Sequence, residues 1–128
     1  MTNMTKLDAL RKQLSSALAR MDEAVQMPKS TLARDAAIKR FEFTFDLVWK
    51  AMRAFLEEQK GVTCVSPKEC MQESFRHGVI AYDDIWMRIP DWRNQIVHEY
   101  SEEFSDDLYR ELPKVLGVFH QLAEALNK

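Results

Sequence analysis

The sequence predicts an all-α protein, an up-and-down bundle of four to five helices joined by short loops. Three observations favour this class. Apolar residues recur at steps of three and four, no segment alternates as a strand does, and only three glycines and four prolines occur among 128 residues. The length suits one domain, residues 1–128, which can bury a core without cross-links.

The first two helices have clear boundaries. Thr5 and Asp8 resemble a capping box, so the first helix begins directly after Thr5 and ends before Pro28. A second, central helix follows over about residues 31–59, with Gly61 as its C-terminal cap. The core stripe expected of the first helix consists of Leu7, Leu10, Leu14, Leu18, Met21 and Val25. The stripe of the second helix consists of Ile38, Phe41, Phe45, Val48, Met52 and Phe55. It is widened by further apolar residues, Phe43, Leu47, Trp49 and Leu56.

Three more helices complete the predicted bundle. A Ser-Pro-Lys-Glu capping signal opens a third helix over residues 66–77. Asp83 or Asp84 caps a fourth helix that extends toward Val97, and Pro90 should kink or interrupt it. The last helix is capped by Ser101 or Ser105 and bent at Pro113. Its apolar stripe consists of Phe104, Leu108, Leu112, Val115, Phe119, Leu122 and Leu126.

Composition narrows the functional classes. The net charge of −2 argues against nucleic-acid binding through a broad basic face. Cys64 and Cys70 match no zinc or redox spacing and are expected as free thiols in a reducing cytosol. Three dispersed histidines form no metal set. The lack of a signal peptide and of an apolar run of about 20 residues predicts a cytoplasmic protein without membrane contact.

One stretch of the fourth helix concentrates groups suited to cutting RNA. Arg93 offers a planar cation for phosphate, His98 can exchange a proton near neutral pH, and Tyr100 has a hydroxyl that can be modified. Cleavage without metal needs a base for the 2′-OH, an acid for the leaving oxygen and a cation for the phosphorane. The spacing of Arg93 and His98 alone is also compatible with structural roles, a surface salt bridge for Arg93 and a favourable position at the end of a helix for His98.

The geometry of an α-helix leaves two ways to bring Arg93 and His98 together. On a straight helix Arg93 and His98 point about 140° apart, whereas Arg93 and Tyr100 nearly align. Either the helix unwinds before His98, or the site combines groups from two chains. We favour a twofold homodimer, because it supplies an acid and a base from one histidine per chain.

Residues 93–100 resemble the R-N-x3-H-x-Y motif of HEPN-domain proteins, and more narrowly the HepT toxin group of nucleotidyltransferase substrate-binding proteins. Residues 39–50 are similar to the K-R-F-E-F-T-F-E-L-x-W-K helix of that group. The resemblance extends over roughly residues 34–112, and it includes a Ser-Pro-Lys-Glu segment, a Gly-Val-Ile turn and a tryptophan seven residues before the motif.

The resemblance implies a homodimeric toxin that cuts RNA without metal or other cofactor, with Arg93 and His98 in the catalytic positions and Asn94 beside them. It also implies a partner, an MntA-like minimal nucleotidyltransferase antitoxin that adenylylates Tyr100 (AMPylation). An added phosphate would occupy the positive field of the site and repel RNA. The chain lacks the Gly-Ser and carboxylate pattern of a transferase and is not expected to transfer nucleotides itself.

Residues around the motif bear on these expectations. Pro90 stands where the group keeps an ordinary helix former, and acidic residues near the motif should weaken attraction to RNA. Glu42 and Asp46 on the second helix either orient Arg93 or His98, or form an ion-paired flank of that helix. The acidic residues near the motif, which should weaken attraction to RNA, are Glu99, Glu102, Glu103, Asp106 and Asp107.

Two other functions are compatible with the sequence. In one, the chain is a non-catalytic subunit that presents a nucleotide or itself to a separate nucleotidyltransferase; Arg93 and His98 then hold phosphate and only Tyr100 is modified. In the other, the chain is a structural helical dimer that shares only the fold of the group.

Overall fold

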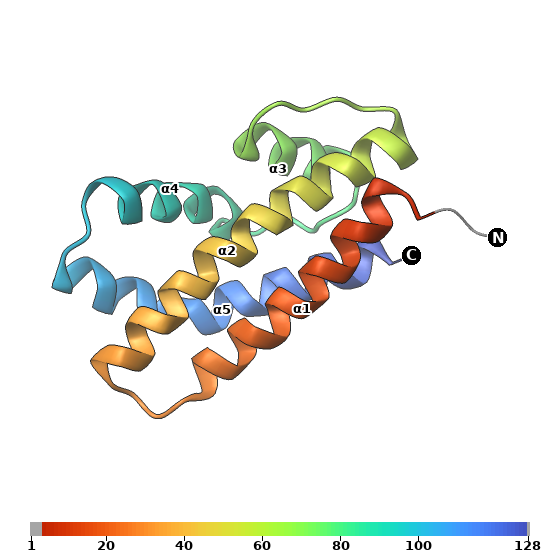
Figure 1. Ribbon diagram of the computed structural model, residues 1–128. Helices are drawn as coiled ribbons and strands as arrows, with labels where there is room; N and C mark the ends of the chain where they lie inside the picture. The colour runs from red at the N-terminus through yellow and green to blue at the C-terminus, as the bar shows by residue number, and fades with distance from the viewer. Residues whose placement is uncertain (1–3, 128) are drawn as a thin grey trace.

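Five α-helices make up the computed structural model, which describes residues 4–127 (Figure 1). No β-strand occurs in that described range, so the predicted all-α class is confirmed. No helix within it is both long and apolar enough to cross a bilayer. The helices are α1 (Lys6–Gln26), α2 (Thr31–Phe55), α3 (Pro67–Arg76), α4 (Ile85–His98) and α5 (Glu102–Leu126), and a π-helical turn, η1 (Leu56–Lys60), extends α2.

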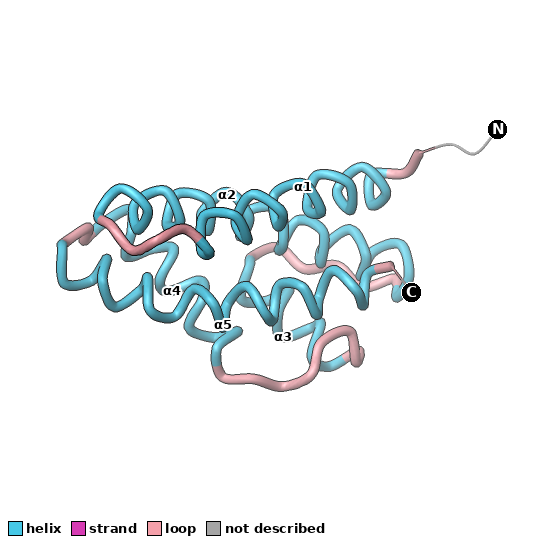
Figure 2. Tube along the Cα trace, turned by 90° about the horizontal axis from the view of Figure 1, so that it is seen from below, coloured by secondary structure: helices cyan, strands magenta, loops and turns pink. Residues whose placement is uncertain are grey.

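The central helix is α2, as its wide apolar stripe predicted. It packs against α1, α3 and α5, while α4 packs against α3 and α5. Figure 2 shows α1 and α2 on one side of the molecule and the other three helices on the opposite side. In the core between them, Phe41 of α2 stacks on Phe119 of α5 with ring centroids 6.3 Å apart, and Trp86 of α4 packs on the same ring. One hydrophobic cluster therefore joins α1, α2, α4 and α5.

Most of the predicted stripe residues are buried, but the prediction for Phe43 was wrong. Its side chain is 62% exposed, whereas Phe41 and Phe45 are buried. A residue two positions from each of these points about 200° away from them on a helix, toward solvent. Aromatic character alone placed Phe43 in the core; the helical period places it outside.

Local capping signals account for where the helices begin. The Thr5 and Asp8 side chains each accept a backbone N–H of the other residue, which confirms the capping box. Of the two serines proposed for the last helix, Ser101 is the cap and accepts from the Phe104 amide at 3.2 Å. Ser105 is instead buried, and its hydroxyl donates to the Ser101 carbonyl at 2.7 Å.

Both internal prolines lie within continuous helices. α5 runs through Pro113, as predicted, and α4 runs through Pro90 without the predicted interruption. A proline removes one helical hydrogen bond, yet α4 continues past Pro90, whose ring is buried. The π-turn after α2 ends at Gly61, whose φ of 65° is the left-handed conformation expected of a glycine cap.

The expectation of free thiols was wrong, because Cys64 and Cys70 form a disulfide. Their Cα atoms are 5.2 Å apart, within the usual range for a bridge. The segment after Gly61 folds back over the start of α3, so a six-residue separation closes into a short loop. Both cysteines are fully buried, and the disulfide joins this segment to α3.

Candidate functional site

The last two turns of α4 carry Arg93, Asn94 and His98. The helix continues to His98, and Glu99 is the first residue after it, with φ −140° and ψ 51°. The alternative in which α4 unwinds before His98 is therefore wrong. Five positions apart on one continuous helix, the Arg93 and His98 side chains leave it about 140° apart. Arg93 is half-buried and His98 is exposed.

A cavity of about 430 Å³ lies between α2, the start of α3 and α4. Arg93 and Asn94 line it from α4, but His98 does not. Neither Arg93 nor His98 forms a side-chain hydrogen bond or ion pair with another residue of the range 4–127. The remaining lining residues come from α2 and from the start of α3, with one more from α4: Phe45, Asp46, Trp49, Ser66, Pro67, Lys68 and Pro90.

The two carboxylates of α2 have different surroundings. Asp46 lines the same cavity as Arg93, but its carboxylate is paired with Lys50 at 2.8 Å, one turn further on. Glu42 lies one turn earlier on the same helical face and is half-buried. Within the described residues neither carboxylate contacts Arg93 or His98 directly. The structure therefore brings Asp46 and Arg93 to one cavity and leaves Glu42 outside its lining.

Tyr100 follows the end of α4 and meets the N-terminal part of α2. Its hydroxyl donates a hydrogen bond of 2.9 Å to Asp35 Oδ1, and its side chain is 49% exposed. Partial burial raises the pKa of Tyr100; the nearby Ser105 hydroxyl opposes this change and the Asp35 carboxylate adds to it. The tyrosine is thus a neutral hydrogen-bond donor held at the junction of α2, α4 and α5.

Arg34 of α2 organises this junction, and sequence reasoning missed it. It is 4% exposed, and its Nη1 donates to Glu102 at 2.8 Å and to Asp106 at 2.9 Å, while its Nε donates to Asp35 at 3.0 Å. Hydrogen bonds from the guanidinium to Glu102 and then Asp106 raise the pKa of Arg34 further above its ordinary value. The signal in the sequence that could have identified Arg34 as buried is its place on the core stripe of α2, three residues before Ala37 and four before Ile38.

The network also explains part of the acidic cluster near the motif. Glu102 and Asp106 pair with Arg34, and Asp107 pairs with Arg110. Three of the five acidic side chains therefore have cationic partners. The remaining two are Glu99 and Glu103, which form no ion pair with residues of the described part of the chain. Because Arg34 is one cation shared by Glu102, Asp106 and Asp35, the cluster keeps a net negative charge, and the expected weakening of RNA attraction remains.

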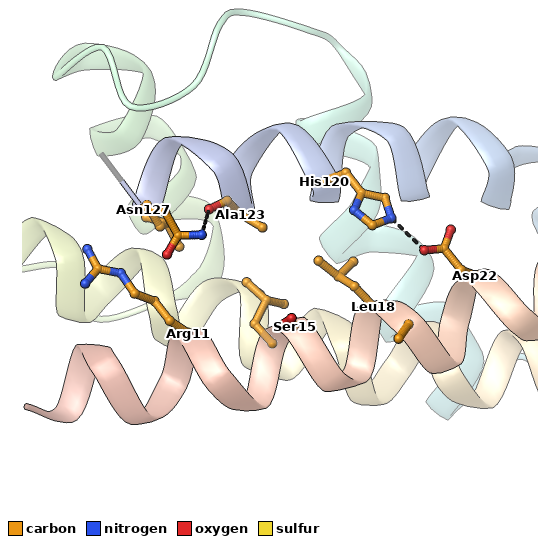
Figure 3. A pocket seen from close by; sticks show the side chains of 10 residues that line it. Arg11, Ser15, Leu18, Asp22, His120, Ala123 and Asn127 are labelled. Carbon is orange, nitrogen blue, oxygen red and sulfur yellow. Dashed lines mark hydrogen bonds and ion pairs between the residues drawn. The ribbon is translucent and has the colours of Figure 1, made fainter. Parts of the chain in front are cut away.

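The other histidines lie away from the motif. Figure 3 shows the His120 ring turned toward Asp22 beside a cavity of about 290 Å³ between α1 and α5, and His120 Nε2 is 2.9 Å from Asp22 Oδ2. His77, at the end of α3, is 3.4 Å from Glu73. Across residues 4–127, no group of three or more potential ligand side chains is arranged to hold a metal ion.

The three tryptophans divide into two kinds. Trp86 and Trp92 are buried, with Trp86 against Phe119 and the Arg88 guanidinium carbon 4.6 Å from the ring centroid of Trp92. Trp49 is half-buried and lines the cavity that contains Arg93. Only this tryptophan, within the described chain, is placed to contact a ligand in that cavity.

Sequence comparisons identify relatives over most of the chain. A protein-family model described as "Nucleotidyltransferase substrate binding protein like" matches residues 6–128. A curated protein of Haemophilus influenzae, a probable ribonuclease HepT, is 27% identical over 96 residues. That match spans 72% of this chain and 66% of the relative, slightly less than two thirds of its length.

Two solved structures have similar folds. A crystal structure of a protein from Thermus thermophilus matches with a TM-score of 0.85 and 31% identity, over 90% of this chain and 99% of the other. A structure from Haemophilus influenzae, described as revealing the fold of a substrate binding domain of a nucleotidyltransferase, matches with a TM-score of 0.65 and 24% identity. It covers 98% of this chain and 100% of the other, and at this identity it supports the fold alone.

Proposed function

The chain belongs to the family of nucleotidyltransferase substrate binding protein like proteins, and from this premise we propose that it is a metal-independent ribonuclease toxin. The observation that carries the proposal is the continuity of α4 through His98. Because Arg93 and His98 diverge within one chain, a site that uses both is built between two copies. The relative that is a probable ribonuclease supports the same reading.

In the proposed homodimer, two copies of Arg93 and His98 share one phosphate-sized cleft. One His98 accepts the proton of the RNA 2′-OH, whose oxygen attacks the adjacent phosphorus. The bond from phosphorus to the 5′-oxygen breaks, and the second His98 donates a proton to that leaving oxygen. Arg93 stabilises the charge of the phosphorane, and the product ends are a 2′,3′-cyclic phosphate and a 5′-hydroxyl.

The proposed partner is an MntA-like nucleotidyltransferase that acts as the antitoxin by adenylylating Tyr100. Two observations support this target: the phenol is half-exposed, and it lies two residues after the end of α4, the helix that carries Arg93 and His98. An adenylyl group there would break the hydrogen bond to Asp35 and add negative charge beside the RNA site. An RNA substrate and this partner are consistent with the cytoplasmic location expected from the sequence.

RNA cleavage in the presence of EDTA tests the proposal. Wild-type protein should cut RNA, and His98→Ala should lose on the order of 10²- to 10⁴-fold in rate because the acid and base are both removed. Arg93→Ala should lose a comparable factor. His120→Ala and Arg88→Ala are matched controls, since His120 pairs with Asp22 and Arg88 packs on Trp92. Inert wild-type protein, or a His98→Ala variant as active as wild type, would refute the assignment.

A second function, a non-catalytic nucleotide-binding subunit, is favoured by one observation. Arg93 and Asn94 line a cavity from which His98 is absent, as suits phosphate binding without acid–base chemistry. Under this alternative, expression without the transferase causes no growth defect, and co-expression still adds mass to Tyr100. The added mass should disappear in Tyr100→Phe. Growth arrest that depends on His98 would instead favour the toxin.

A further inference from the structure

The cavity between α2, α3 and α4 has walls suited to a nucleotide. Its volume of about 430 Å³ is typical of small-molecule sites. Trp49 and Phe45 of α2 supply aromatic surface, and Pro67 and Pro90 supply further apolar surface from α3 and α4. Lys68 at the start of α3 and Arg93 on α4 add two cations. Aromatic and cationic groups in one cavity are the combination that binds single nucleotides of RNA.

Trp49 is the natural stacking platform. It is half-buried and lines the cavity, while Trp86 packs on Phe119 in the core and Trp92 is covered by the exposed Arg88. A half-buried indole in a cavity can present its face to a base while its edge remains packed in the protein. Stacking of a base on an aromatic side chain tolerates any base, so a second contact is needed for selectivity.

The polar groups that line the cavity provide that second contact, and they favour the base on one side of the cavity and the phosphate on the other. Asp46, on the α2 wall, is an acceptor-only carboxylate; Lys50 donates to its Oδ2 at 2.8 Å, and its remaining acceptor positions can receive a hydrogen bond from an amino group of a base. Arg93 and Asn94 lie on α4, and Lys68, paired with Asp91 at 2.8 Å, lies at the start of α3. The cations attract phosphate on their side, whereas Asp46 repels it on the other.

We propose that this cavity is a nucleobase subsite: a base with an exocyclic amino group stacks on Trp49 and donates to Asp46, while its phosphate contacts Arg93 and Lys68. The subsite rests on the proposed function, since it names the RNA nucleotide that is held beside the cleavage motif. Adenine, cytosine and guanine satisfy Asp46. Uracil presents carbonyl oxygens in place of the amino group and has only its ring N3–H to donate, so its contact with the carboxylate is weaker.

Titration of the full-length protein with AMP, CMP, GMP and UMP, followed by calorimetry and by tryptophan fluorescence, tests the subsite. We expect the three amino-bearing nucleotides to bind about 10-fold or more tightly than UMP. Trp49→Ala should weaken binding on the order of 10-fold or more, and Trp49→Phe should retain most of it because a stacking ring remains. Asp46→Asn should remove the discrimination against UMP. Phe43→Ala is the control, because Phe43 lies on α2 outside the cavity.

The outcomes separate the subsite from the ribonuclease activity. If His98→Ala binds nucleotides normally but wild type cuts no RNA, the subsite stands and the catalytic function fails. If RNA cleavage depends on His98 but Trp49→Phe and Trp49→Ala both leave KM and nucleotide affinity unchanged, the subsite is wrong. The subsite is equally refuted if wild-type protein binds none of the four nucleotides, or if Asp46→Asn discriminates against UMP as wild type does.

Discussion

At the scale of single residues, Arg34 is the most consequential side chain outside the motif. It is nearly inaccessible to solvent and joins α2 to the start of α5 through Glu102 and Asp106. A buried guanidinium is tolerated when its donors are matched by carboxylates, as they are here. Because Asp35 contacts both Arg34 and Tyr100, this network also fixes the position of the proposed modification site.

Replacing Arg34 should destabilise the fold. Arg34→Met keeps the apolar stem but removes the guanidinium, so the melting temperature should fall by on the order of 5 °C. Arg110→Met is the matched control, because its ion pair with Asp107 is exposed and should contribute little. Thermal unfolding followed by circular dichroism measures both. Equal melting temperatures for the two variants would contradict the structural role of Arg34.

The titration of Tyr100 tests its contact with Asp35. Burial and Asp35 raise the pKa of Tyr100, because the phenolate would lie partly out of water and beside a like charge. The neutral phenol therefore stabilises the fold at pH values below its unfolded pKa, and this contribution is lost as pH rises through the folded pKa. Asp35→Asn should lower the pKa of Tyr100, whereas Asp46→Asn should not. Tyrosine Cζ chemical shifts against pH measure this; no change in Asp35→Asn would contradict the contact.

At the scale of elements, the helices follow from local signals and the connections between them do not. Caps such as Thr5 and Ser101 act within three residues, and each apolar stripe is a property of one helix, so both can be predicted from the sequence. The contacts that form the site span long separations: Tyr100 to Asp35 is 65 residues and Arg34 to Glu102 is 68. No local rule connects such pairs.

In the motif, too, the residues could be predicted from the sequence but their arrangement in space could not. Arg93, His98 and Tyr100 could be selected by residue type and resemblance, but their relation depends on where α4 ends. The helix includes His98 and excludes Tyr100, so the near alignment of Arg93 and Tyr100 expected on a straight helix does not occur. Trp49 and Lys68, which share the cavity with Arg93, were not predictable as neighbours because they come from two other parts of the chain.

The segment between η1 and α3 depends on its disulfide. Closing a loop of about six residues should contribute about 2 kcal/mol to the free energy of unfolding, by restricting the unfolded chain. Cys64→Ala/Cys70→Ala, or wild type in reductant, should lose this amount in urea denaturation. The double variant itself should not respond to reductant. Two titratable thiols in non-reduced, denatured wild-type protein would contradict the bridge.

At the scale of the whole molecule, the proposed activity requires a second copy. In the proposed homodimer the α4 surface near the motif forms the contact between copies, and Val97, 56% exposed beside His98, lies on that surface. The small net charge of −2 favours such association over long-range repulsion between copies.

The composite site has a direct test in a heterodimer of one wild-type chain and one His98→Ala chain, purified with two different affinity tags. If each cleavage uses one His98 as base and the other as acid, the heterodimer should cut RNA on the order of 10²-fold more slowly than the wild-type homodimer. A heterodimer that retains half of the wild-type rate would show that each chain cuts with its own histidine, and it would contradict the shared cleft.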